Sequence, residues 1–155
     1  MKVLLAVDGS ADTKKMLAYL TEHAGLLGTT PQYFVLNVQP AIPGHAAKVV
    51  GRETVNLYYS SEAEKVLRPI DKFLDRHGVD YTSSYGVGHA AEEILKAATK
   101  NKVDLIVEKF VYGTQHFFRF ARMVDVDGFA SHHFRRVARN CGLHVEHKIR
   151  WGGTK

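Results

Sequence analysis

The sequence predicts an α/β domain built on a doubly wound parallel sheet. An apolar run too short for a helix occupies residues 3–7, and residues 103–107 (Val-Asp-Leu-Ile-Val) form a second candidate buried strand. Amphipathic helical patterns separate the candidate strands, and glycine-centred turns join them. Strands covered by helices on both faces appear as such unbroken apolar runs. Up to residue 107 the elements alternate strand, helix, strand, helix, strand, helix, strand, which implies parallel strands joined by right-handed crossovers.

The first strand organises the rest of the chain. Residues 3–7 read Val-Leu-Leu-Ala-Val, which predicts the central strand of the sheet, and Asp8-Gly9 ends it. Ser10 can accept a hydrogen bond from the free N–H groups of a helix that begins at Ala11. Residues 11–27 then carry apolar side chains at helical spacing, and Gly28 closes this helix.

A second strand is expected over residues 33–38, closed by Pro40. Residues 39–51 contain two prolines and two glycines, so we expect a loop at the carboxyl end of this strand, where α/β proteins often carry function. A helical pattern follows over residues 60–77. Pro69 lies inside it and is expected to bend the helix.

Two further strands complete the pattern. Residues 80–85 predict a third strand, and their Thr and Ser content indicates an edge position. Residues 89–100 predict a third helix, with acidic residues near its start and lysines near its end, as the helix dipole favours. Residues 103–107 predict a fourth, buried strand.

We expect one domain over residues 1–155, located in the cytoplasm. The chain is 45% hydrophobic, which suffices for a proper core. No apolar run approaches the roughly 18 residues needed to cross a bilayer, so no membrane association is expected. Met1-Lys2 lacks the layout of a secretory signal. Cys141 is the single cysteine and is expected to be a structural thiol.

The chain changes character near residue 107. Residues 1–107 hold 12 basic and 12 acidic residues, whereas residues 108–155 hold 9 and 4 and so carry the whole net charge of +5. Two explanations are open. Divergence could have kept a helix over residues 129–140 and a strand over 143–149. Alternatively, the reading frame changed near codon 107 and left a tail that was not selected to fold.

Four segments together resemble the universal stress protein family. They stand in the family's order and spacing: residues 2–10 (Lys-Val-Leu-Leu-Ala-Val-Asp-Gly-Ser), 35–38 (Val-Leu-Asn-Val), 88–95 (Gly-His-Ala-Ala-Glu-Glu-Ile-Leu) and 103–107 (Val-Asp-Leu-Ile-Val). The resemblance implies a five-stranded parallel sheet of order 3-2-1-4-5, Rossmann-like and similar to adenine-nucleotide alpha hydrolases. It also implies a homodimer paired through the fifth strand, and ATP binding in some members.

The resemblance implies that Asp8, Gly9 and Val38 hold the adenosine part of a nucleotide. In ATP-binding members the fourth strand runs into Met-Gly and then Gly-x2-Gly-x9-Gly-Ser/Thr, because glycines let backbone N–H groups approach phosphates at a helix N-terminus. This chain departs from that pattern, with Glu108 and Lys109 at the Met-Gly positions. With insertions allowed, Gly113 and Gly128 are the remaining phosphate candidates, and Lys109 is a candidate source of positive charge.

Asp8 has two interpretations that the sequence leaves open. It ends the first strand beside the crevice where the strand order should reverse, which is the default ligand position in open α/β sheets. It could equally fix its own turn through hydrogen bonds to the backbone. The family resemblance favours the ligand role.

We expect neither a metal site nor nucleic-acid binding. The tail histidines pair at spacings that point them to different faces, so they share no ion easily; they are His116, His132, His133, His144 and His147. Arg135, Arg136 and Arg139, together with Phe134 and the aromatic residues 117, 118 and 120, are better explained as a solvated basic face and as core. No catalytic constellation is evident, since Ser10 has no histidine at a recognisable spacing.

The sequence therefore predicts a cytoplasmic stress-response protein that acts as a nucleotide-responsive binding module. ATP with Mg²⁺ is the expected cofactor, and enzymatic activity beyond slow ATP hydrolysis is not expected. The alternative is a family member that no longer binds nucleotide and works through protein contacts or dimerisation.

Overall fold

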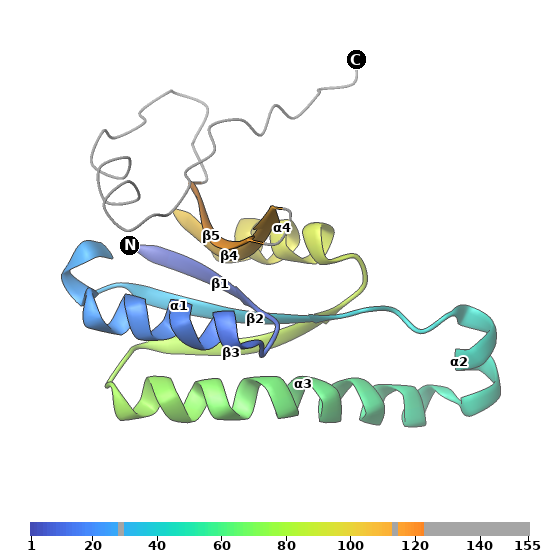
Figure 1. Cartoon of the computed structure of the whole chain (residues 1–155). Coiled ribbons are helices and arrows are strands. Elements are labelled where there is room, and N and C mark those ends of the chain that lie inside the picture. Colours follow the sequence, from blue (N-terminus) through green and yellow to red (C-terminus); the bar gives the residue numbers. More distant parts are fainter. Residues whose placement is uncertain (28–29, 113–114, 123–155) are drawn as a thin grey trace, which may run out of the picture.

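The computed structural model describes residues 1–27, 30–112 and 115–122 (Figure 1). Side chains are not described for residues 24, 26, 109–112 and 115–122. The helices and strands follow in this order: β1 (Lys2–Val7), α1 (Ala11–Glu22), the 3-10 helix η1 (Ala24–Leu27), β2 (Gln32–Gln39), α2 (Gly44–Val50), α3 (Arg52–Arg76), β3 (Tyr81–Val87), α4 (Ala90–Asn101), β4 (Leu105–Tyr112) and β5 (Gln115–Arg122).

The described sheet has the order β3-β2-β1-β4-β5. Its first four strands are parallel, which confirms the predicted α/β class, and β3 lies at an edge as predicted. The fifth parallel strand that the resemblance implies was expected over residues 143–149, which lie outside the described residues. The fifth described strand is another segment, β5, and it pairs antiparallel with β4. Only two residues separate β4 from β5, and so short a connection permits a hairpin and excludes a parallel crossover.

Helices cover both faces of the sheet, α1 and α3 on one face and α4 on the other (Figure 1). An apolar core lies on each face of the sheet, and alternate residues of β1 pack into one or the other. Val3, Leu5 and Val7 pack with α1 and α3, while Leu4 packs with the cluster beneath α4. This double burial explains why β1 is an unbroken apolar run.

The region after β2 differs from the expected loop. Residues 44–50 form α2, and α3 begins at Arg52, about eight residues earlier than predicted, and continues through Pro69. Helix α2 buries no residue, so it offers no apolar stripe from which it could be predicted. Pro69 is exposed, and water can therefore replace the backbone hydrogen bond that proline removes.

Within the described part of the chain, no helix combines the length and the apolar character needed to span a membrane.

Hydrogen bonds fasten β3 to α3. The Tyr81 hydroxyl donates to Asp75 Oδ1 at 2.8 Å and lies 3.3 Å from the Asp71 carbonyl oxygen, and the Ser83 hydroxyl donates to the Asp71 carboxylate. Loss of water around the phenol, the hydrogen bond to Asp75 and the two negative charges raise the pKa of Tyr81 from 10.0 to about 12.

We predict that stability falls as pH rises from about 10 to about 12. Because the folded state raises the pKa of Tyr81, its stabilisation is complete below pH 10 and is lost as the phenol ionises near pH 12. Denaturant unfolding of the wild type and Tyr81→Phe across this range tests the prediction. The fall should be smaller in Tyr81→Phe, whereas Tyr58→Phe, which alters an exposed tyrosine of α3, should follow the wild type. Identical profiles for all three proteins would contradict it.

Candidate ligand site at the carboxyl edge of the sheet

The strand order reverses between the carboxyl ends of β1 and β4. From β1 the chain crosses toward β2 and β3, whereas β4 lies on the other side of β1. The helices that follow β1 and precede β4, α1 and α4, accordingly lie on opposite faces (Figure 1). Ligands of open α/β sheets bind at such reversal points.

Asp8 organises the turn at this edge. Its Oδ1 accepts hydrogen bonds from the Ser10 N–H at 3.0 Å and the Thr13 hydroxyl at 2.8 Å. Ser10 caps α1 as predicted, since its Oγ accepts from the Thr13 N–H at 3.4 Å. The structure therefore confirms that Asp8 fixes its own turn. Asp8 remains exposed at the edge, so its role toward a ligand stays a prediction.

Gly9 has both a conformational and a steric reason to be glycine. Its φ is +75°, a left-handed value that other residues rarely adopt. A Cβ placed there would lie 3.2 and 3.3 Å from the two methyl carbons of Val66 on α3. The turn after β1 is thus pressed against α3, which fixes where the chain leaves the sheet.

A series of hydrogen bonds continues from this turn across the carboxyl ends of the strands. Asn37, buried in β2, donates from Nδ2 to the Val7 carbonyl oxygen at 2.8 Å and accepts from Gln39 Nε2 at 2.6 Å. The Gln39 carbonyl oxygen in turn accepts from the Gly88 N–H at 3.0 Å. These contacts tie β1, β2 and the turn after β3 together at the carboxyl edge.

The structure brings the three predicted adenosine residues to the same edge. Val7 pairs with Asn37, so Asp8 and Val38 follow at neighbouring positions of adjacent strands, and Gly9 comes next. The Val38 side chain is half-buried and packs on the cluster beneath α4. Thr13 and Asn37 were not predicted as site residues. The one available signal was an asparagine within an otherwise apolar strand.

In the described residues, the segment that was expected to bind phosphate does not form a loop after residue 107. The strand was expected to end at Val107, but it runs on to Tyr112, and Lys109 lies within it. Residues 105–112 contain no glycine, and their Phe, Val and Tyr residues favour the pairing with β5 that extends the strand. Gly113 and Gly128 lie outside the described residues.

Several other predictions concern the tail. The helix over 129–140, the strand over 143–149, Cys141, the basic residues Arg135, Arg136 and Arg139, and the histidines at 132, 133, 144 and 147 all lie outside the described residues. Of His116 only the backbone is described, and it belongs to β5.

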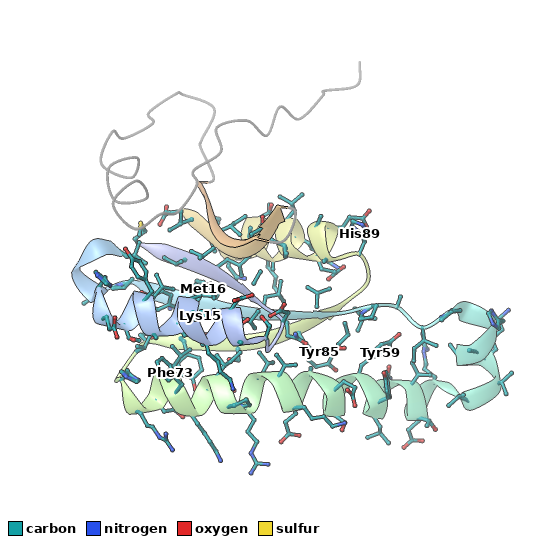
Figure 2. All side chains as sticks on the ribbon, viewed as in Figure 1. Lys15, Met16, Tyr59, Phe73, Tyr85 and His89 are labelled. Carbon is teal, nitrogen blue, oxygen red and sulfur yellow. The ribbon has the colours of Figure 1, made fainter. Side chains whose placement is uncertain are left out.

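The segment after β2 is anchored beside the site by a buried tyrosine. The Ile42 N–H donates to the Tyr59 hydroxyl oxygen at 2.6 Å. Figure 2 shows Tyr59 on α3 directed toward the sheet, with Tyr85 of β3 nearby. Tyr59 is buried, whereas Tyr85 is 43% exposed. Helix α3 therefore positions both the turn at Gly9 and the segment that leaves β2.

The fold defines an α/β protein with a parallel sheet whose strand order reverses between β1 and β4. The model of the Universal stress protein family matches residues 1–108. The chain belongs to the universal stress protein family. A search of curated proteins finds no match.

Solved structures share the fold. The hypothetical protein MJ0577 is 26% identical with a TM-score of 0.53, over 68% of this chain and 71% of that one. UspA from Lactobacillus plantarum is 15% identical with a TM-score of 0.53, over 94% and 95%. A universal stress protein family protein from Arabidopsis thaliana, solved with AMP bound, is 17% identical with a TM-score of 0.51, over 70% and 75%.

We predict that Gly9→Ala lowers the free energy of unfolding by about 1–2 kcal/mol, because alanine pays for the left-handed φ and crowds Val66. Gly44→Ala is the matched control: nothing lies within 4 Å of its added Cβ, and it should be neutral or slightly stabilising. Urea denaturation measures both. Equal stabilities for the two variants would show that the turn does not constrain Gly9.

We predict that Thr13→Val lowers the free energy of unfolding by about 1–2 kcal/mol, because it removes the donor to the Asp8 carboxylate from a residue only 3% exposed. Thr99→Val on α4 is the control, since its hydroxyl is exposed and bonds only within its own helix. That change should stay within about 0.5 kcal/mol. Thermal and urea unfolding measure the difference, and a Thr13→Val protein as stable as the control would contradict the prediction.

Proposed function

We propose that this universal stress protein is an adenine-nucleotide-responsive binding module of the cytoplasmic stress response. The observation that supports this most is the placement of Asp8, Gly9 and Val38 together at the point where the order of the parallel strands reverses. A protein of the same fold carries AMP, which supports adenine nucleotide as the ligand.

Each of the three residues has a role suited to adenosine. The exposed Asp8 carboxylate would accept hydrogen bonds from ribose hydroxyls, while its Oδ1 keeps the turn closed. Gly9 would let the ligand approach the backbone without a side chain in the way. Val38 would offer an apolar contact to the base.

The phosphate groups of a nucleotide would contribute less to the binding affinity than its adenosine part. Lys109, Gly113 and Gly128 remain the candidates for phosphate contacts, and Mg²⁺ would accompany ATP there. The eight residues of β4 contain no glycine, and the strand runs straight into a hairpin. We therefore expect AMP and Mg-ATP to bind with similar affinity, and any ATP hydrolysis to be slow.

The alternative function is protein contact without nucleotide. The same hairpin favours it, because it occupies the position that follows β4 in the chain, where the phosphate loop was expected. In the described sheet β5 is the outer strand beside β4, so a homodimer formed through the fifth strand would pair on an antiparallel strand.

Calorimetric titration with AMP and with Mg-ATP tests the leading proposal. We predict micromolar binding that Asp8→Asn weakens at least about tenfold, since a hydrogen bond to a charged group is worth roughly 1.5–3 kcal/mol. Asparagine keeps an oxygen that can accept from Ser10 and Thr13, so the turn should survive. Asp80→Asn, an exposed carboxylate before β3 at the opposite edge, is the matched control and should bind normally.

Two results would contradict the proposal. One is absence of heat up to millimolar nucleotide from a folded protein, which would favour the protein-contact alternative. The other is equal binding by the wild type and Asp8→Asn, which would place the nucleotide elsewhere.

A further inference from the structure

A cavity of about 300 Å³ opens at the amino edge of the sheet, between the C-terminal parts of α1 and α3. Figure 1 shows this edge at the opposite end of the strands from α2. Its apolar wall is formed by Leu5, Leu17, Leu20 and Leu74, and its polar groups include Tyr33 and Thr21. It shares no residue with the turn at Asp8.

The wall belongs to the main core. The four leucines are each at most 4% exposed and lie in the cluster between the sheet and helices α1 and α3. An unfilled hollow lined by core side chains costs stability because these side chains lack packing partners on one side. A ligand with an apolar body of matching size would recover those contacts. The volume is at the lower end of small-molecule sites.

Tyr33 gives the cavity a polar anchor. The residue is 5% exposed, it lines the cavity, and no hydrogen bond to its hydroxyl is found among the described residues. Burial raises the pKa of Tyr33, so the phenol stays protonated and can donate. In the described residues no fully buried side-chain oxygen lacks a partner, so the Tyr33 hydroxyl keeps some contact with solvent, and the acceptor atom of a ligand in the cavity would take the place of water there.

Thr21 supplies a second polar point. Its hydroxyl is engaged as a donor with the Leu17 and Ala18 carbonyl oxygens, at 3.1 and 2.9 Å, so toward a ligand it can only accept. The charged or titratable groups at this cavity, His77 and Asp80, are exposed at its rim. The interior therefore suits an uncharged molecule.

We propose that this cavity is a binding site for a small, uncharged, amphipathic molecule. Its hydrocarbon ring packs against the leucines, and one of its atoms accepts a hydrogen bond from the Tyr33 hydroxyl. Such a ligand would be recognised independently of nucleotide, because the two sites lie at opposite edges of the sheet.

The test uses acetophenone, an aromatic ring with one carbonyl acceptor, and ethylbenzene, a ring of similar size without an acceptor. We predict that acetophenone shifts the backbone amide resonances of Thr21, Tyr33 and Gly78 in the full-length protein. Tyr33→Phe should weaken the affinity for acetophenone about fivefold, as expected for the loss of one hydrogen bond of about 1 kcal/mol. The affinity for ethylbenzene should stay unchanged. Asp8→Asn should not alter either affinity.

Leu20→Phe provides a second variant, since the larger ring should fill the cavity and abolish binding of both probes. Thermal unfolding of each variant without probe establishes that it is folded. The proposal is overturned if neither probe shifts these amides up to millimolar concentration. It is also overturned if Tyr33→Phe weakens both probes equally, because the hydroxyl would then have no specific role.

Discussion

The carboxylate of Asp8, held by the Ser10 N–H and the Thr13 hydroxyl, is the interaction on which the rest of the structure depends. It closes the turn between the central strand and the first helix. Gly9 adds a steric constraint, because its left-handed backbone lies against Val66 and a side chain there would crowd the valine methyl groups. Together these contacts set the end of β1, the start of α1 and the distance to α3, and thereby the geometry of the carboxyl edge.

The two edges of the sheet have different chemistry. At the carboxyl edge, Asp8, Asn37 and Gln39 present carboxylate and amide groups that already bond to the backbone and to one another. At the amino edge, core leucines border a cavity whose polar groups include the hydroxyls of Tyr33 and Thr21. A polar, hydrogen-bonded edge suits the hydroxyl groups of a ribose, whereas an apolar cavity suits a small hydrocarbon ring. One small domain thus offers two kinds of surface without overlap.

The sequence predicts the elements of the first 107 residues well because their signals are local. Apolar runs mark β1 and β4, and Ser10 marks the start of α1. Helix α2 was missed because it buries nothing, and the β4–β5 hairpin was missed because mixed aromatic and charged residues obscure its alternation. The structure brings the predicted residues Asp8, Gly9 and Val38 to one edge of the sheet, and their role toward a ligand stays a prediction. Thr13 and Asn37 become recognisable only when the fold brings them to Asp8 and Val7.

We propose that this protein binds nucleotide at the carboxyl edge of the sheet, around Asp8. Amide chemical-shift mapping of the isotope-labelled full-length chain during an AMP titration tests it most directly. The account predicts that the largest shifts occur at Gly9, Ser10, Val38 and Gln39, with little change at Thr21 or Gly78. Shifts that gather at the amino edge, or a folded protein with no shifts at millimolar AMP, would contradict it.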